Sequence, residues 1–220
     1  MLTKSELNRA ISSWKRQKIK IIAVAGPRKA GKDVAVEYIV RNYKSVKHLR
    51  IADAPMLIAK ILGLEADRRV YHALFGVNKL LYPLLGESAY MRRVAHMLDT
   101  EKPKIALVEA IRTKEEYRAF VEKRKGILIC VTADPKVRYA RALKDAAHKT
   151  QKRDEGKMTF NEFMGDRKRG TGEHSPIERE VNWIISKAPF VITNNYDDKE
   201  PVHKKLKEIL SSLGLKRKSR

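Results

Sequence analysis

Residues 26 to 33 have the types and spacing needed to hold a polyphosphate. Gly26 and Gly31 are separated by four residues, and Lys32 follows the second glycine. Glycines permit turns in which several backbone N–H groups point at the same phosphate oxygens, and a helix starting there adds its positive end. Lys32 would reach the β- and γ-phosphates of a nucleoside triphosphate. We expect the nucleotide to contact Gly26, Pro27, Arg28, Lys29, Ala30, Gly31, Lys32, Asp33 and Val34.

Asp33 stands where this pattern usually has a hydroxyl residue. One interpretation is structural, because an acidic residue in the first turn of a helix gains about 0.3 to 1 kcal/mol from the macrodipole. The other is functional. A bare carboxylate would repel a triphosphate, so Asp33 would need Mg²⁺ between them or would face the phosphoryl acceptor. We favour contact with the metal or the acceptor.

Short apolar runs alternate with helical patterns along the sequence, and they predict the strands and helices that position this loop. Strands are expected at 19–25, 105–108, 127–131 and 190–193, with a weaker run at 48–52. Helices are expected at about 32–43, 113–124, 135–148, 176–187 and 199–212. Nearly continuous apolar strands are typical of a parallel sheet covered on both faces. We therefore predict an α/β fold with a five-stranded parallel sheet and helices on both faces.

Two segments are too long to be simple crossovers. Residues 54–103 contain apolar helical patterns and no convincing strand, which favours a helical region that forms an acceptor pocket. Residues 142–176 are rich in charge and poor in apolar residues, as expected of a lid. Within this lid Arg167, Lys168 and Arg169 precede hinge-like glycines at 170 and 172. At the ends, we interpret residues 1–18 as a helical arm and 213–220 as a basic tail, of which we expect residues 216–220 to be disordered.

The stretches GPRKAGKD, ALVEAIRTKEEY, VTADPKVRYARALK and PFVITNN together resemble the P-loop small-molecule kinases of the dephospho-CoA kinase and nucleoside monophosphate kinase type. The Gly-Lys-Asp ending is similar to that of phage deoxynucleoside monophosphate kinases and animal-type phosphomevalonate kinases. The resemblance covers most of residues 19–212. It implies a three-layer P-loop NTPase fold, ATP and Mg²⁺ as cofactors, and a small phosphorylated acceptor. The acceptor expected first is a nucleoside or deoxynucleoside monophosphate, and dephospho-CoA is the alternative.

The same resemblance implies roles at the acceptor side. Glu109 lies at the carboxyl end of an expected strand, where such kinases have an acidic residue, usually Asp, that contacts the magnesium shell or the acceptor. Arg112 resembles the arginine that grips the acceptor. Asp53 would meet the acceptor hydroxyl or its metal. Arg92 and Arg93 lie in an amphipathic helix of the acceptor region, so one of them, for which we take Arg92, would bind an acceptor phosphate while the other faces solvent. Each has a structural alternative as a capping, loop or solvent-exposed charge.

Other residues are expected on the nucleotide side. The resemblance places lid-base arginines at Arg138 and Arg141, where a guanidinium can neutralise charge on the transferring phosphoryl group. Asn194 and Asn195 follow the last strand, at the position where such kinases hold the adenine base. Exposed helix arginines and an ordinary turn are the structural alternatives.

The large positive net charge of the chain fits a second function, which involves nucleic acid. The chain has 48 Lys and Arg against 26 Asp and Glu, a formal net charge of +22. This excess fits a nucleic-acid-associated NTPase, or a binding protein that retained the fold, because a basic surface binds any phosphate backbone. The sequence shows no recognisable nucleic-acid-binding module. No apolar run approaches the roughly 18 residues of a membrane span, so we expect a cytoplasmic protein without membrane contact.

Overall fold

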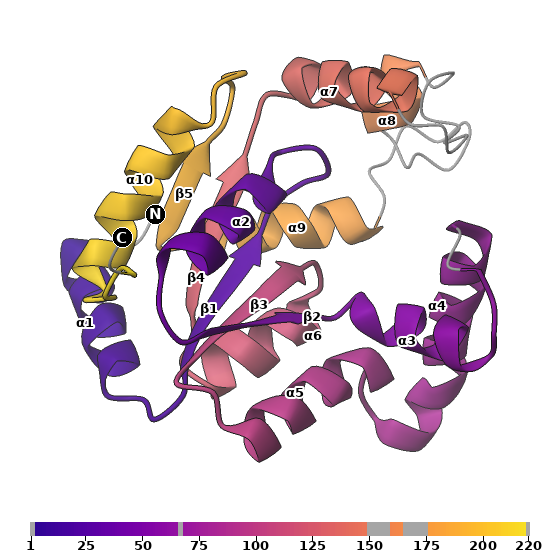
Figure 1. Cartoon of the computed structure of the whole chain (residues 1–220), viewed down its shortest axis with the longest axis horizontal. Helices are drawn as coiled ribbons and strands as arrows, with labels where there is room; N and C mark the ends of the chain where they lie inside the picture. Colours follow the sequence, from indigo (N-terminus) through magenta and orange to yellow (C-terminus); the bar gives the residue numbers. More distant parts are fainter. Residues whose placement is uncertain (1–2, 66–67, 149–158, 165–175, 219–220) are drawn as a thin grey trace.

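The computed structural model describes residues 3–65, 68–148, 159–164 and 176–218 (Figure 1). One parallel sheet forms the centre, with the strand order β2-β3-β1-β4-β5. The strands are β1 (Lys20–Ala25), β2 (Val46–Arg50), β3 (Ile105–Ile111), β4 (Ile127–Thr132) and β5 (Phe190–Thr193). The predicted five-stranded parallel α/β fold is therefore confirmed.

Two strands differ from the prediction by more than one residue at an end. β2 covers residues 46–50 instead of 48–52, because a turn at 51–52 leads directly into the next helix. β3 extends beyond residue 108 and contains a bulge: Val24 pairs with Glu109, whereas Ala25 pairs with Ile111. Ala110, the extra residue, has a φ of 67°, in the left-handed region that non-glycine residues rarely adopt. The bulge lies beside Glu109, one of the residues expected in the site.

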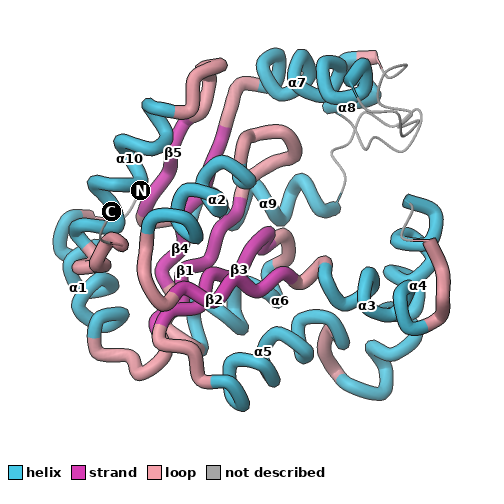
Figure 2. Tube along the Cα trace, viewed as in Figure 1, coloured by secondary structure: helices cyan, strands magenta, loops and turns pink. Residues whose placement is uncertain are grey.

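Helices cover both faces of the sheet (Figure 2). They are α1 (Lys4–Lys15), α2 (Lys32–Asn42), α3 (Asp53–Ile61), α4 (Arg68–Leu85), α5 (Ala89–Glu101), α6 (Lys114–Tyr117), the π-helix η1 (Arg118–Lys123), α7 (Pro135–His148), α8 (Phe160–Met164), α9 (Pro176–Lys187) and α10 (Glu200–Ser212). The segment from 54 to 103 is helical as expected, forming α3, α4 and α5. The expected lid supplies the end of α7, the short α8 and the start of α9, and its residues 167–170 and 172 lie outside the described residues.

Successive residues of β1 build two cores. Ile22 and Val24 pack with apolar residues of α1, α2 and α10 on one face. Ile21, Ala23 and Ala25 pack with residues of α3, α5, η1 and α9 on the other face. This alternation follows from the period of two along a strand, and every strand position of β1 after Lys20 is buried.

Both ends of the chain are joined to this frame. Trp14 of α1 is fully buried, and its Nε1 donates a hydrogen bond to the Ile21 carbonyl at 2.7 Å. At the other end, the Lys218 N–H donates to the Asn42 carbonyl at 2.8 Å, and Lys218 Nζ donates to the Val40 carbonyl at 2.9 Å. The prediction of a disordered end is therefore wrong for residues 216–218, because the carbonyls ending α2 bind this cationic segment.

Candidate active site

The loop between β1 and α2 has the backbone geometry of a phosphate cradle. Gly26, Lys29 and Gly31 have φ angles of 144°, 61° and 93°, so the chain turns repeatedly in conformations that favour glycine. A Cβ on Gly26 would lie 2.0 Å from the Val131 carbonyl oxygen, which leaves no room for a side chain. Gly31 begins α2 without a side-chain cap, so the first N–H groups of the helix are available to an anion.

Lys32 lies over this loop. Its Nζ donates a hydrogen bond to the Pro27 carbonyl at 2.9 Å. Burial is the main reason that the pKa of Lys32 falls to about 8, and the nearby positive charge of Arg112 lowers it further. A triphosphate in the loop would replace lost hydration and provide negative charge. The site is therefore electrostatically prepared for a polyanion.

Asp33 lies in the first turn of α2 and is exposed. This position fits the structural interpretation, because the carboxylate is close to the positive end of the helix. It also fits the functional one, because the side chain is open to solvent beside the cradle. The two interpretations of Asp33 both remain compatible with the structure.

Asn194 buttresses the loop from the end of β5. Its Nδ2 donates to the Ala30 carbonyl at 2.9 Å, and its backbone N–H donates to the Thr132 carbonyl at 2.7 Å. A Cβ on Gly31 would lie 2.2 Å from this same Nδ2. Asn195 instead holds the start of α7, since its side chain exchanges hydrogen bonds with the backbone and carboxylate of Asp134 at 2.8 and 2.7 Å. These contacts position the loop and use the polar atoms that we expected to face adenine.

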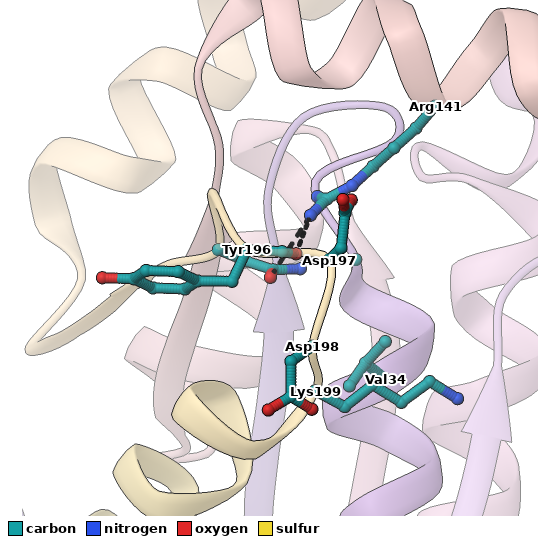
Figure 3. A pocket seen from close by; sticks show the side chains of 8 residues that line it. Val34, Arg141, Tyr196, Asp197, Asp198 and Lys199 are labelled. Carbon is teal, nitrogen blue, oxygen red and sulfur yellow. Dashed lines mark hydrogen bonds between the residues drawn. The ribbon is translucent and has the colours of Figure 1, made fainter.

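Arg141 reaches from α7 to the same corner. Its Nη2 donates to the Tyr196 carbonyl at 2.6 Å, and longer contacts of 3.5 Å reach the Lys29 carbonyl and Asn194 Oδ1. Together with the β5–α10 loop it bounds a cavity of about 150 Å³, lined by Gly31, Val34, Arg141, Asn194, Tyr196, Asp197, Asp198 and Lys199 (Figure 3). The dashed lines in Figure 3 mark hydrogen bonds that Arg141 makes with other residues lining this cavity. Arg141 therefore lies between the loop and this cavity.

Arg138 lies about one turn before Arg141 in α7 and is buried. Its positive charge contributes to the lowered pKa of Lys32, which places it near the cradle. The guanidinium carbons of Arg138 and Arg28 lie 5.9 and 5.4 Å from the ring centre of Phe163 in α8. Phe163 was not expected in the site. The Thr159–Glu162 capping pattern of its helix was the signal available in the sequence.

A second group of charges gathers where β2 and β3 end. The Glu109 Oε2 atom accepts a hydrogen bond from His48 Nε2 at 2.6 Å and lies 3.4 Å from Arg50 Nε. Arg50 Nε also lies 3.6 Å from the Asp53 carboxylate. The His48 hydrogen bond is the main cause that lowers the pKa of Glu109, and Arg50 adds to it. We call His48, Arg50, Asp53 and Glu109 the acidic–basic cluster.

This cluster is joined electrostatically to the loop. Glu109 contributes to the pKa of Lys32, and Lys32 in turn lowers the pKa of Glu109. Arg112 follows β3, is exposed, and acts on Lys32 as well. Arg92, by contrast, lies on α5, where it is exposed and pairs with Glu87 at 3.6 Å. The structure brings Glu109 and Arg112 near Lys32, connects Asp53 to Glu109 through Arg50, and shows Arg92 in a surface pair.

His48 and Arg50 were not expected in the site from the sequence. Both belong to the weak strand β2, in which they point to the same side while Leu49 is buried on the other. The alternation of the stretch HLR was the available signal. Their partner Glu109 is about 60 residues away and becomes a neighbour only through the β2–β3 pairing.

The residues fit ATP and fit Mg²⁺ only in part. The glycine turns, the open helix start and Lys32 are the groups that hold a triphosphate. For Mg²⁺, Asp33 offers an exposed carboxylate, whereas Glu109 is already bound by His48 and Arg50, which disfavours a direct contact with a cation. Within the described residues, no three His, Cys, Asp or Glu side chains converge as a metal site.

Two further features of the described chain are its cysteine and the character of its helices. Cys130 is buried in β4, and burial raises the pKa of its thiol to about 12, so the thiol is inert near neutral pH. Among the helices that the structure describes, none has the length and apolar character of a membrane span.

Comparisons with known proteins support the fold. No known protein family and no curated protein matches the sequence. Among solved structures, TT1252 from Thermus thermophilus superposes with a TM-score of 0.54 at 16% identity, over 88% of this chain and 97% of that one. The dephospho-CoA kinase from Campylobacter jejuni superposes with a TM-score of 0.47 at 12% sequence identity, over 89% of this chain and 97% of that one. The shikimate kinase from Bacteroides thetaiotaomicron superposes with a TM-score of 0.48 at 11% sequence identity, over 89% of this chain and 99% of that one.

At these identities the first superposition concerns the fold alone. The parallel sheet, with the cradle at the carboxyl end of its central strand and helices on both faces, is a P-loop fold.

Proposed function

We propose that the protein is an ATP-dependent kinase that transfers the γ-phosphate to a small phosphorylated acceptor. One observation carries this proposal: the phosphate cradle with Lys32 and the acidic–basic cluster lie at the same edge of the sheet and are electrostatically coupled. A nucleotide side and an acceptor side are thereby next to each other, as phosphoryl transfer requires. The acceptor we favour is a nucleoside or deoxynucleoside monophosphate, and dephospho-CoA is the alternative.

On the nucleotide side, the chain binds and orients the triphosphate. The loop amides and the start of α2 would hold the β- and γ-phosphates, while Lys32 and Arg138 would neutralise charge that develops on the γ-phosphoryl group. Asp33 would hold Mg²⁺, which would further neutralise the phosphate oxygens. Arg141 and Asn194 position the loop against the cavity that would receive the base.

On the acceptor side, we assign roles within the cluster. Both carboxylate contacts of Arg50 use Nε, so its two terminal nitrogens can make a bidentate contact with an acceptor phosphate. Glu109 and His48 would hold Arg50 in place. With a hydroxyl acceptor such as dephospho-CoA, the Asp53 carboxylate would accept the hydrogen bond of the attacking hydroxyl group. Arg112 would add positive charge between the two substrates.

A panel of acceptors tests the function. The protein is incubated with γ-labelled ATP, Mg²⁺ and, separately, nucleoside monophosphates, deoxynucleoside monophosphates, dephospho-CoA and 5′-hydroxyl oligonucleotides. We expect saturable label transfer to one small phosphorylated compound. Transfer to oligonucleotides alone, or hydrolysis stimulated only by nucleic acid, would instead support the rival NTPase function suggested by the net charge of +22.

Removal of the Arg50 side chain should affect the acceptor and spare ATP. For Arg50→Ala we expect the KM of the acceptor to rise roughly 10- to 100-fold, because a charge-assisted hydrogen bond contributes about 1.5 to 3 kcal/mol. The KM of ATP should stay within about twofold of the wild-type value. Arg92→Ala is the matched control, since both arginines are exposed on the acceptor side. An increase with Arg92→Ala alone would move the acceptor phosphate to α5.

Replacement of Asp33 separates its two interpretations. If Asp33 holds Mg²⁺, the Asp33→Ser variant should need roughly tenfold more Mg²⁺ for half-maximal activity, as is common when a group that supports a metal is changed. The measurement is a Mg²⁺ titration of initial rates at saturating ATP. An unchanged titration curve, with unchanged activity, would show that the carboxylate serves only the start of α2.

Binding of ATP should take up protons in a defined pH range. The pKa of Lys32 in the free protein is about 8, below its ordinary value of 10.5, and a bound triphosphate would raise it again. Uptake should therefore appear between about pH 7.5 and 10 and vanish near pH 6.5, where Lys32 is already charged. Calorimetric titrations in buffers of different ionisation enthalpy measure it. Lys32→Met serves as the control and should show no uptake.

A further inference from the structure

The segments that lead into four of the five strands are strongly basic. They are residues 15–20, 44–47, 102–104 and 123–125, which read KRQKIK, KSVK, KPK and KRK. Lysine and arginine supply eleven of these sixteen residues, and none of the sixteen is acidic. We call these four segments the basic edge.

Parallel pairing brings the four segments together. Ile105, the first residue of β3, pairs with Lys20 of β1 and with Val46 of β2, and Ile127 of β4 pairs with Ile22. The amino ends of these strands therefore lie at one edge of the sheet, opposite the carboxyl ends that carry the phosphate cradle (Figure 1). The sequence scatters these charges over more than 100 positions, and the topology collects them.

Contacts join the segments into one surface. The Lys20 N–H donates a hydrogen bond to the Lys104 carbonyl at 3.2 Å. A cavity of about 280 Å³ lies between the first and fourth segments, lined by Gln17, Lys18, Ile19, Ile21 and Arg124. The first segment therefore contacts the third through this hydrogen bond and borders the fourth across a partly hollowed surface.

The neighbouring carboxylates neutralise only part of this charge. Lys47 pairs with Glu101 at 2.7 Å, and Arg124 holds both oxygens of Asp99 at 2.7 and 2.9 Å. Both carboxylates come from the end of α5, outside the basic edge. Because these segments contain no acidic residue, a strong positive potential remains at this end of the sheet.

Two of the charges are kept at a cost to the backbone. Lys102 and Lys125 have φ angles of 46° and 55°, in the left-handed region where glycine is the least strained residue. Lys102 ends α5 at a position that glycine or asparagine usually occupies. Glycine would be less strained at both positions, and the chain has lysine there instead.

We propose that the basic edge binds the phosphate backbone of double-stranded nucleic acid. In the part of the chain that the structure describes, the exposed large apolar side chains all lie outside this edge. It therefore offers nothing to insert into a membrane and no ring on which an unpaired base would stack. The available interaction is between cations and regularly spaced phosphates, which is independent of base sequence and strongly dependent on salt. The phosphate cradle, at the opposite edge, stays accessible to ATP.

Charge reversal in three segments tests the proposal on the full chain. The variant Lys18→Glu/Lys104→Glu/Lys125→Glu is compared with Lys60→Glu/Lys136→Glu/Lys144→Glu, which makes the same change in net charge on exposed residues of α3 and α7. Fluorescence anisotropy follows a labelled RNA duplex of about 20 base pairs over a range of salt concentrations. We expect the edge variant to bind at least tenfold more weakly, and its log–log salt dependence to be shallower by about 2.7, because each phosphate that a lysine neutralises adds about 0.9 to the slope. The control variant should stay within about threefold of the wild type.

Three outcomes would overturn the proposal. Equal weakening in both triple variants would show that net charge and not location decides binding. Displacement of the duplex by ATP would place it in the phosphate cradle. Tighter binding to phosphatidylserine vesicles than to the duplex, abolished in the edge variant, would assign the edge to a membrane surface. Retained ATP binding and an unchanged melting temperature show that the edge variant is folded, and the neutral variant Lys18→Ala/Lys104→Ala/Lys125→Ala provides a second test should Glu impair folding.

Discussion

Lys32→Met should lower kcat/KM for phosphoryl transfer by at least about 10²- to 10³-fold without lowering the melting temperature. The decrease in rate follows because a preorganised cation beside the transferring group contributes most in the transition state, and removal of one such group typically has an effect of this size. Methionine keeps most of the side-chain volume, so packing around the loop is preserved.

The unchanged stability follows from the pKa of Lys32. Burial lowers this pKa to about 8 from 10.5, which means that the folded state disfavours the charged form at pH 7. This penalty is present below pH 8 and disappears as the pH rises through the unfolded value, so removing the amine cannot take away stability from this source. Single-turnover kinetics and thermal melts at pH 7 provide the measurement. Lys136→Met, at an exposed position of α7, is the control, and wild-type turnover in Lys32→Met would remove the loop from the mechanism.

Gly26→Ala should have the largest effect on the fold and should also abolish ATP binding. The added Cβ would lie 2.0 Å from the Val131 carbonyl oxygen and 3.0 Å from its carbon, both in the backbone of β4. A strand inside the sheet cannot yield as a side chain would, and the φ of 144° is unfavourable for alanine. Overpacking typically costs about 1 to 3 kcal/mol, and the backbone conformation adds to it. We expect a decrease in stability of about 3 kcal/mol or more, or at least about 6 °C in melting temperature.

A glycine without such constraints provides the control. Gly76 lies inside α4, and a Cβ there would have no neighbour within 4 Å. Gly76→Ala should leave the melting temperature unchanged or raise it, since alanine is favoured over glycine in a helix by up to about 1 kcal/mol. Thermal melts and ATP titrations of both variants check the prediction. Normal stability and ATP binding in Gly26→Ala would mean that the loop does not pack on β4 as the structure has it.

The sequence predicted well those elements that depend on residues close together in the chain. The phosphate-binding loop is a continuous stretch whose glycines and lysine stand at fixed spacing, and α7 and α9 begin and end where the periodicity and the prolines at 135 and 176 indicated. The strands β1, β3, β4 and β5 were visible as apolar runs because both faces of the sheet are covered. β2 was misplaced by two residues since its polar side chains at 48 and 50 weaken that signal.

The residues that were missed depend on contacts between distant parts of the chain. His48 and Arg50 acquire a role only when β2 pairs with β3 beside Glu109. The amide of Asn194, which we expected on the nucleotide side, meets the Ala30 carbonyl only through packing between residues 164 positions apart. Which partner an amide or carboxylate finds is decided by tertiary packing, because its hydrogen bond reaches only about 3 Å.

The sequence by itself determined the chemistry available to this protein: a glycine turn with a lysine for phosphate, apolar strands for a parallel sheet, and a large excess of positive charge. The tertiary structure alone decided where that chemistry acts. Parallel pairing directs all carboxyl ends to one edge, where the cradle meets Glu109, and all amino ends to the other, where the basic segments gather. The physical reason is that strand order depends on long-range burial and hydrogen bonding, which no local pattern of residues contains.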